Sequence, residues 1–133
     1  MQAHLYNGQS LAYIGDACYE IQIRLYLLKK GLTKVNSLHK EAIKYTSGIA
    51  QSKAINFLLE NKILTLEEEM IYHRGRNIKC GQNRKNISIA DYQKATGFEA
   101  IIGYLYLINN TNRIKEIVDL VINYLEGDTS DGQ

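Results

Sequence analysis

Two carboxylates stand in stretches whose other residues are typical of a helix-bundle core. Asp16 lies within LAYIGDACYE, and Glu99 lies within ATGFEAIIGYLYL. A buried, ionised carboxylate without a partner costs several kcal/mol, so it becomes protonated, pairs with a cation or binds a metal. We therefore treat both acids as candidates for chemistry.

Neither acid has a basic residue within one helical turn. The residues three and four positions away from Asp16 and from Glu99 include no lysine or arginine. If two helices bring the acids together, the pair could bind a hard divalent cation through oxygen, with water completing an octahedron. Gly15, beside Asp16, would let another helix approach closely. The alternative is that each acid accepts a hydrogen bond from a helix cap or a tyrosine, or lies on the surface.

A third acid, Glu20, lies one helical turn after Asp16 and four residues before Arg24. Glutamate followed by arginine at this spacing favours a surface ion pair on a helix. A secondary hypothesis gives Glu20 a supporting role behind a metal ligand. We favour the ion pair.

The segment between Glu69 and Asp91 contains no acid, although the chain as a whole carries 16 Lys+Arg against 14 Asp+Glu and a formal charge of only +2. Its lysines and arginines are Arg74, Arg76, Lys79, Arg84 and Lys85. Glycine and asparagine lie between them, so backbone amides could add contacts to a phosphate chain. The shortage of aromatic residues favours contact with a duplex backbone over stacking on single strands. The alternative is a solvated surface segment.

Helices must position these acids and cations. The chain of 133 residues has no proline, and its apolar residues recur at helical spacing, so we expect one domain with an all-α fold. The expected helices span about 10–30, 37–45, 47–60, 65–76, 88–108 and 113–126, with Ser10, Thr65 and Ser88 as N-caps. Residues 77–90 are expected to form a long loop.

The first helix is expected to be apolar on two nearly opposite sides. One stripe comprises Leu11, Ile14, Cys18, Ile21, Leu25 and Leu28, and the other comprises Ala12, Tyr19, Ile23 and Leu27 around Asp16. A helix that is apolar on both sides lies inside a bundle or between a bundle and a partner subunit. We therefore expect Asp16 to be buried.

The sequence shows no sign of export or membrane insertion. Its N-terminal residues lack a basic region followed by an apolar one, and no apolar run approaches ~20 residues. The two cysteines form neither a zinc-ligand spacing nor a disulfide framework. These observations favour a cytoplasmic protein that does not enter a membrane.

Three stretches of the sequence match known motifs in both order and spacing. They are YIGDACYE at 13–20, HRGRNIK at 73–79 and ATGFEAIIGYLYL at 95–107. In content and spacing they resemble Mini-ribonuclease III, the short relatives of the ribonuclease III nuclease domain that lack a double-stranded-RNA-binding domain. The resemblance implies an all-helical endonuclease domain over 1–127 with a polar tail at 128–133. It also implies a homodimer that cleaves double-stranded RNA with Mg²⁺, for which Mn²⁺ substitutes. The implied substrate is the precursor of large-subunit (23S) ribosomal RNA, with ribosomal proteins on that precursor as further partners.

The same resemblance implies roles for individual residues. Asp16 matches the aspartate of the family's G-D signature and Glu99 the glutamate of its F-E-A signature, the two acids that ligate catalytic metal. The basic segment from Arg74 to Lys85 matches the region that approaches RNA. Larger ribonuclease III enzymes carry further acids where this chain has Ala12 and Thr96, so the resemblance implies a reduced ligand set.

The expected mechanism is phosphodiester hydrolysis in which Asp16 and Glu99 hold Mg²⁺ and no protein nucleophile takes part. Two other functions remain open at this point. The chain could be a catalytically silent RNA-binding or ribosome-assembly module on the same scaffold, or an all-helical interaction protein unrelated to RNA. Cleavage of an RNA duplex with Mg²⁺, and its loss with EDTA, would separate these functions.

Overall fold

The computed structural model describes the backbone of residues 2–78 and 87–131 and the side chains of these residues as far as residue 127. The elements in this part of the chain are the short 3₁₀ helix η1 (Ala3–Leu5) and the α-helices α1 (Gly8–Lys29), α2 (Val35–Thr46), α3 (Gly48–Glu60), α4 (Leu66–Arg76), α5 (Ile89–Leu107) and α6 (Thr111–Asp131). No strand occurs among the described residues. The predicted all-α fold is confirmed, and no helix in the described part is long and apolar enough to cross a membrane.

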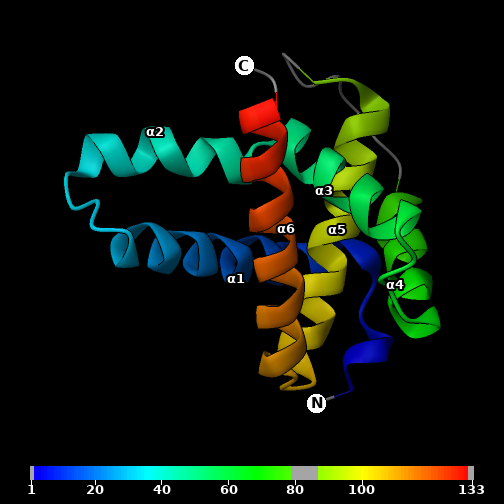
Figure 1. Cartoon of the computed structure of the whole chain (residues 1–133). Helices are drawn as coiled ribbons and strands as arrows, with labels where there is room; N and C mark the ends of the chain where they lie inside the picture. The colour runs from blue at the N-terminus through cyan, green and yellow to red at the C-terminus, as the bar shows by residue number, and fades with distance from the viewer. Residues whose placement is uncertain (1, 79–86, 132–133) are drawn as a thin grey trace.

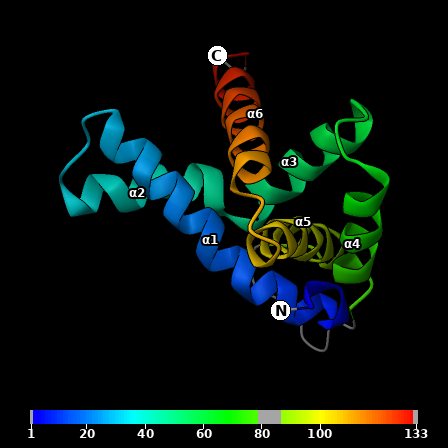
Figure 2. The ribbon, with the colours of Figure 1, turned by 90° about the horizontal axis from the view of Figure 1, so that it is seen from below.

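Helix α5 forms the centre of the molecule. It packs against α1, α3, α4 and α6, and Figure 2 shows it end-on with these helices around it. Every residue from 95 to 105 is buried except Glu99, which is half-buried. Because α5 is apolar all round, its burial supplies much of the hydrophobic stabilisation of the fold. A carboxylate on this helix is therefore an exception that needs a local cause.

The ends of the helices follow the capping residues in the sequence. Thr65 and Glu68 form the predicted capping box of α4, and the Ser88 side chain accepts a hydrogen bond from the backbone N–H of Asp91 at the start of α5. The predicted N-cap Ser10 is wrong, because the side chain of Asn7 accepts from the Ser10 N–H at 2.8 Å and α1 begins two residues earlier. Helix α6 continues to Asp131, beyond its predicted end.

Of the two alternatives for α1, the structure excludes burial on both sides by the helices of the same chain. Helices α1 and α2 lie side by side. The C-terminal end of α1 and the N-terminal end of α2 project beyond the other helices (Figure 1). One side of α1 packs into the molecule through Leu11, Tyr19 and Ile23, whereas Ile21 is 57% exposed on another side. Asp16 is also exposed rather than buried, because it lies at the edge of the buried side.

A buried ion pair joins the beginnings of α4 and α6. The Arg113 guanidinium donates to both carboxylate oxygens of Glu68 at 2.8 Å and to the Ile63 carbonyl at 2.8 Å. The two side chains are 17% and 4% exposed, respectively. Burial by itself would raise the pKa of Glu68, but the hydrogen bonds from Arg113 and from the Thr65 backbone outweigh it and hold this pKa below its ordinary value.

Candidate active site

Helices α1 and α5 cross with their backbones in contact. A Cβ placed on Gly15 would lie 1.7 Å from the carbonyl oxygen of Glu99, and a Cβ on Gly103 would lie 1.9 Å from the carbonyl oxygen of Leu11. No side chain could occupy either space, so the crossing requires glycine on both helices. Asp16 follows Gly15 directly, and Glu99 lies one turn before Gly103. The two acids are therefore carried to the same point by the contact between the helices.

The side chains of Asp16 and Glu99 line one pocket of about 410 Å³. The remaining residues around this pocket are Gln9, Ala12, Tyr13, Ile78, Tyr92 and Thr96. Burial raises the pKa of Glu99 most strongly, and hydrogen bonding and charge repulsion with the Asp16 carboxylate raise it further, to about 9. The structure thus brings together the two acids that sequence reasoning selected, at a position where ionisation of both is unfavourable.

The oxygen-rich lining of this pocket fits a hard divalent cation. Two carboxylates face a pocket to which Thr96 and Gln9 also contribute, and a cation between the carboxylates would offset their repulsion. Within the described residues no cluster of three or more His, Cys, Asp or Glu could hold a metal. A site with two carboxylates suits Mg²⁺, which keeps several of its waters when it binds to proteins. It does not suit zinc, which prefers nitrogen and sulfur ligands.

A second pocket of about 440 Å³ borders Glu99 on the side of α3. Gln51 of α3 lines it together with Ile87, Tyr92 and Thr96. Sequence reasoning missed Gln51, although the signal was available. Gln51, Ile55 and Leu58 follow one another at helical spacing and are all buried, so Gln51 is a polar residue on an apolar stripe, as each candidate acid was expected to be.

Both ends of the predicted 77–90 loop lie beside the acids. Ile78 lines the pocket that contains Asp16 and Glu99, and Ile87 lines the pocket that contains Glu99 and Gln51. The side chain of Gln93 donates to the Ile78 carbonyl at 3.2 Å, which holds the first end against α5. The predicted RNA contacts Lys79, Arg84 and Lys85 lie outside the described residues. Residues near both ends of the predicted 77–90 loop thus lie at the rim of the candidate site.

The two described arginines of this segment differ in their contacts. Arg74 donates through Nη1 to the carbonyl oxygens of His4 and Tyr6, at 2.8 and 3.2 Å, and so fastens the N-terminal residues to α4. Arg76 donates to the side chain of Asn77 at 3.3 Å. Both arginines are exposed. Arg74 therefore has a structural role that the charge pattern did not reveal.

Comparison with known proteins identifies this arrangement. The model of the ribonuclease III domain matches residues 9–110, a range that includes both acids as well as Arg74 and Arg76. The chain belongs to the ribonuclease III family. A crystal structure of a protein from Fusobacterium nucleatum has the same fold, with a TM-score of 0.78 and 33% identity over 90% of this chain and 93% of that one.

The relatives in sequence are short ribonuclease III proteins of similar length. Mini-ribonuclease 3 of Clostridium tetani is 50% identical over 96% of this chain and 84% of its own length. Mini-ribonuclease 3 of Streptococcus pneumoniae is 44% identical over 96% of this chain and 99% of its own length. The predicted resemblance is confirmed, and the chain is an endoribonuclease of a family that generally acts on double-stranded RNA.

Within this ribonuclease III fold, the residues one helical turn before Asp16 and Glu99 are uncharged. Ala12 and Thr96 line the carboxylate pocket, where the larger enzymes are expected to carry further acids. The Thr96 hydroxyl donates to the Tyr92 carbonyl of its own helix at 2.9 Å. Glu20 forms the predicted ion pair with Arg24 at 3.2 Å. Glu20 is not among the residues that line the pocket.

Proposed function

We propose that this endoribonuclease hydrolyses double-stranded RNA with Mg²⁺ held by Asp16 and Glu99. The observation that carries the proposal is the crossing at Gly15 and Gly103, which brings two acids from distant parts of the sequence into one pocket. When bound, the cation supplies a Lewis acid that lowers the pKa of an attacking water and neutralises charge developing on phosphate oxygens. Mn²⁺, which also accepts oxygen ligands in octahedral geometry, is expected to substitute.

The protein's own contribution is to hold its groups in place before RNA arrives. The backbone contact between α1 and α5 fixes the positions of Asp16 and Glu99, so no loop must close to assemble the carboxylate pair. The burial of Glu99 strengthens the preference of this carboxylate for a cation over solvent. No side chain is needed as a covalent nucleophile.

The basic segment is proposed to hold the RNA backbone. Arg76, Lys79, Arg84 and Lys85 would bind phosphates, and Arg74 would contribute while it fastens the N-terminal residues. The proposal is supported by Ile78 and Ile87, which place both ends of the segment at the rim of the acidic pocket. Contacts of this kind give affinity that falls with salt and carry little sequence information.

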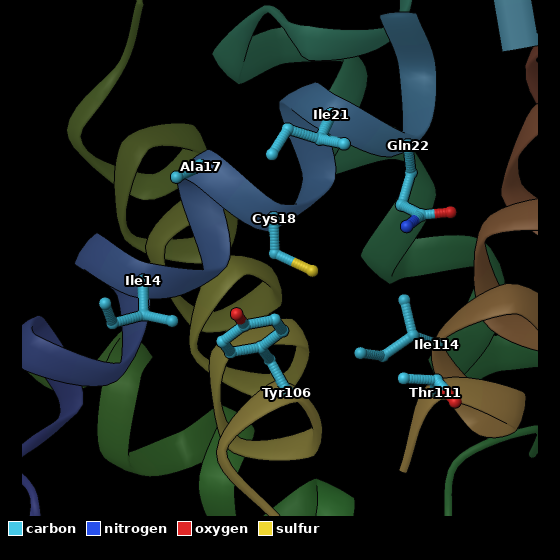
Figure 3. Close-up of a pocket in the computed structure, with 8 residues that line it drawn as sticks. All are labelled: Ile14, Ala17, Cys18, Ile21, Gln22, Tyr106, Thr111 and Ile114. Carbon is cyan, nitrogen blue, oxygen red and sulfur yellow. The ribbon is translucent and has the colours of Figure 1, made fainter. Parts of the chain in front are cut away.

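A second copy of the chain is proposed to cover the exposed apolar side of α1. Figure 3 shows an apolar pocket of about 270 Å³ on this side, between α1, the end of α5 and the start of α6. It is lined by Ile14, Ala17, Cys18, Ile21, Gln22, Tyr106, Thr111 and Ile114. An apolar surface of this kind is typical of an interface, and ribonuclease III proteins generally function as dimers. A dimer would present two sites along one RNA duplex, which compensates for the small footprint of one copy.

The proposed natural substrate is the precursor of large-subunit (23S) ribosomal RNA, bound in the cytoplasm with ribosomal proteins already on it. The resemblance to Mini-ribonuclease III supports this substrate. Cells depleted of the protein should accumulate precursor with extended ends, which primer extension would measure. Mature ends at normal levels would contradict this part of the proposal.

Cleavage of a long RNA duplex by the purified protein tests the chemical proposal. Activity with Mg²⁺ should be lost with EDTA and in Asp16→Asn and Glu99→Gln, which keep side-chain volume but remove the charges that hold the cation. Glu20→Gln is the matched control, because Glu20 lies one turn from Asp16 but pairs with Arg24. Full activity in Asp16→Asn would refute the assignment, and loss of activity in Glu20→Gln would favour a supporting role for Glu20.

A further inference from the structure

Gln51 is a buried amide with an unused acceptor next to the candidate site. Its side chain lies on α3 and only 2% of the residue is exposed. Its Nε2 donates to the Thr46 carbonyl at 3.1 Å, but its buried Oε1 has no hydrogen-bond partner among the described residues. Leaving a buried acceptor unpaired costs free energy, so packing alone does not account for an amide at this position.

The same amide interacts with Glu99. A hydrogen bond from Gln51 lowers the pKa of Glu99, in opposition to the larger effects of burial and of Asp16. Gln51 and Glu99 line the same pocket of about 440 Å³, and the amide has a second N–H that Thr46 does not use. The Thr46 carbonyl fixes the orientation of the amide, because turning it over would bring the amide oxygen against another acceptor. This orientation directs one N–H of Gln51 at Thr46 and leaves the other available to the pocket that Gln51 shares with Glu99.

We propose that Gln51 is a positioning residue that holds the Glu99 carboxylate in the orientation needed to bind the divalent cation with Asp16. This inference rests on the proposed function, because it concerns the same pair of acids. Groups that hydrogen-bond to a metal-ligating carboxylate fix its orientation, and their loss typically lowers metal affinity by about 10–100-fold. Gln51 lies beside Glu99 on the side of α3, whereas Asp16 lies beside it on the side of α1.

Gln51→Met tests this role, since methionine keeps the length of the side chain and removes its donor and acceptor. Binding of Mn²⁺ to the purified protein should be measured by electron paramagnetic resonance without RNA. We expect affinity to fall by about 10–100-fold. Thermal unfolding without metal should be unchanged or shifted upward, because the unpaired Oε1 is gone. Cleavage of duplex RNA should recover at high Mg²⁺ concentration.

Ser52→Ala is the matched control. Ser52 follows Gln51 on α3 and is also 2% exposed, and its hydroxyl donates at 2.7 Å to Asp91, a carboxylate of α5 that lies outside both pockets. Removing this hydroxyl loosens the contact between α3 and α5 without touching Glu99. The proposal requires Ser52→Ala to bind Mn²⁺ as the native protein does.

Two outcomes would overturn the role of Gln51. Native affinity for Mn²⁺ in Gln51→Met would show that Glu99 needs no support from α3, although the proposed function would stand if Asp16→Asn lost binding in the same assay. Equal losses in Gln51→Met and Ser52→Ala would show a general effect of loosened packing. If the native protein and Asp16→Asn bind Mn²⁺ equally, the metal site itself is refuted, and the role of Gln51 fails with it.

Discussion

Gly15 of α1 lies directly against the backbone of Glu99 of α5, so that a Cβ on the glycine would overlap the Glu99 carbonyl oxygen at 1.7 Å. Glu99 is one candidate metal ligand, and Gly15 directly precedes the other, Asp16, in the chain. The separation of the two carboxylates is therefore set by a contact between backbones. Changes that spread these helices should affect stability and catalysis together.

Gly15→Ala is predicted to destabilise the protein and to abolish most cleavage. The added methyl group meets backbone atoms, which cannot rotate away, so the helices must separate at a cost of about 2 kcal/mol or more. A shift of about 1 Å between catalytic groups can lower a rate about 100-fold. Urea unfolding and the rate of duplex cleavage would measure the two effects.

Gly127→Ala provides the control for this prediction. Gly127 lies in α6, and a Cβ on it would have no atom within 4 Å. Alanine in an open helical position should stabilise the fold by about 0.5–1 kcal/mol and leave cleavage unchanged. Equal effects of the two substitutions would contradict the close contact at Gly15.

Acid should weaken the fold through Glu68. Its pKa in the folded protein lies below the ordinary value of 4.5, so its pairing with Arg113 stabilises the fold fully above that value. This contribution is lost as the pH falls through the lowered pKa and the carboxylate takes up a proton. Glu68→Gln should therefore cost about 1.5–3 kcal/mol at pH 7, and its difference from the native protein should shrink toward pH 3.

Urea unfolding at several pH values measures this difference. Glu116 pairs with the same Arg113 but its side chain is 61% exposed, so Glu116→Gln should change stability much less at every pH. A difference between Glu68→Gln and the native protein that stays constant from pH 7 to 3 would contradict the role of the buried pair.

The sequence predicts the local features of the fold better than its long-range contacts. Thr65 and Glu68 were identified as a capping box because their spacing satisfies backbone donors within one turn. The pairing of Glu68 with Arg113 was not predictable, because no periodic pattern relates residues 45 positions apart. The N-cap Asn7 was missed, although asparagine three residues before Ser10 is a capping signal in its own right.

Ile21→Glu is predicted to convert a dimer into monomers. Ile21 is 57% exposed on the apolar side of α1, and burying a charge in the proposed interface would oppose association. Sedimentation equilibrium measures the change. Met70→Glu is the control, because Met70 is 67% exposed on α4 and no residue of α4 lines the pocket in Figure 3. A monomeric native protein, or a dimer that survives Ile21→Glu, would remove this face from the proposal.

Arg76→Ala is predicted to weaken binding of duplex RNA and to reduce the dependence of log affinity on log salt by about 1. Fluorescence anisotropy at several salt concentrations, with Ca²⁺ in place of Mg²⁺, measures both quantities. Lys62→Ala is the control, because Lys62 is exposed in the turn between α3 and α4 and lines neither pocket. An unchanged salt slope in Arg76→Ala would exclude a phosphate contact by this residue.

Arg74→Ala should differ from Arg76→Ala in its effect on the N-terminal residues. Its guanidinium holds the carbonyl oxygens of His4 and Tyr6, so its removal should free η1 as well as remove a charge. Hydrogen exchange of the first residues should rise in Arg74→Ala only. Equal exchange in both variants would contradict the fastening role of Arg74.

The sequence predicted which two acids belong to the candidate site. It did not predict how exposed they are or which residues surround them. Asp16 and Glu99 were selected because a charge on an apolar helical stripe is unusual, and the structure places them in one pocket. The burial predicted for Asp16 was wrong because Asp16 lies at the edge of the buried side of α1, and periodicity does not show where the covered side ends. The position of Gln51 beside Glu99 depends on the packing of α3 on α5, which periodicity does not specify.

Because the backbones of α1 and α5 are in contact at their crossing, these helices cannot move closer together. The positions of Asp16 and Glu99 on the two helices are therefore set before any substrate is present. In the proposed function, the choice among RNA molecules would then fall to the rim of the pocket, to which Ile78 and Ile87 belong. Substitutions at that rim would leave the pair Asp16 and Glu99 in place. Related proteins with this fold could therefore differ in their RNA targets while they share the same arrangement of acids.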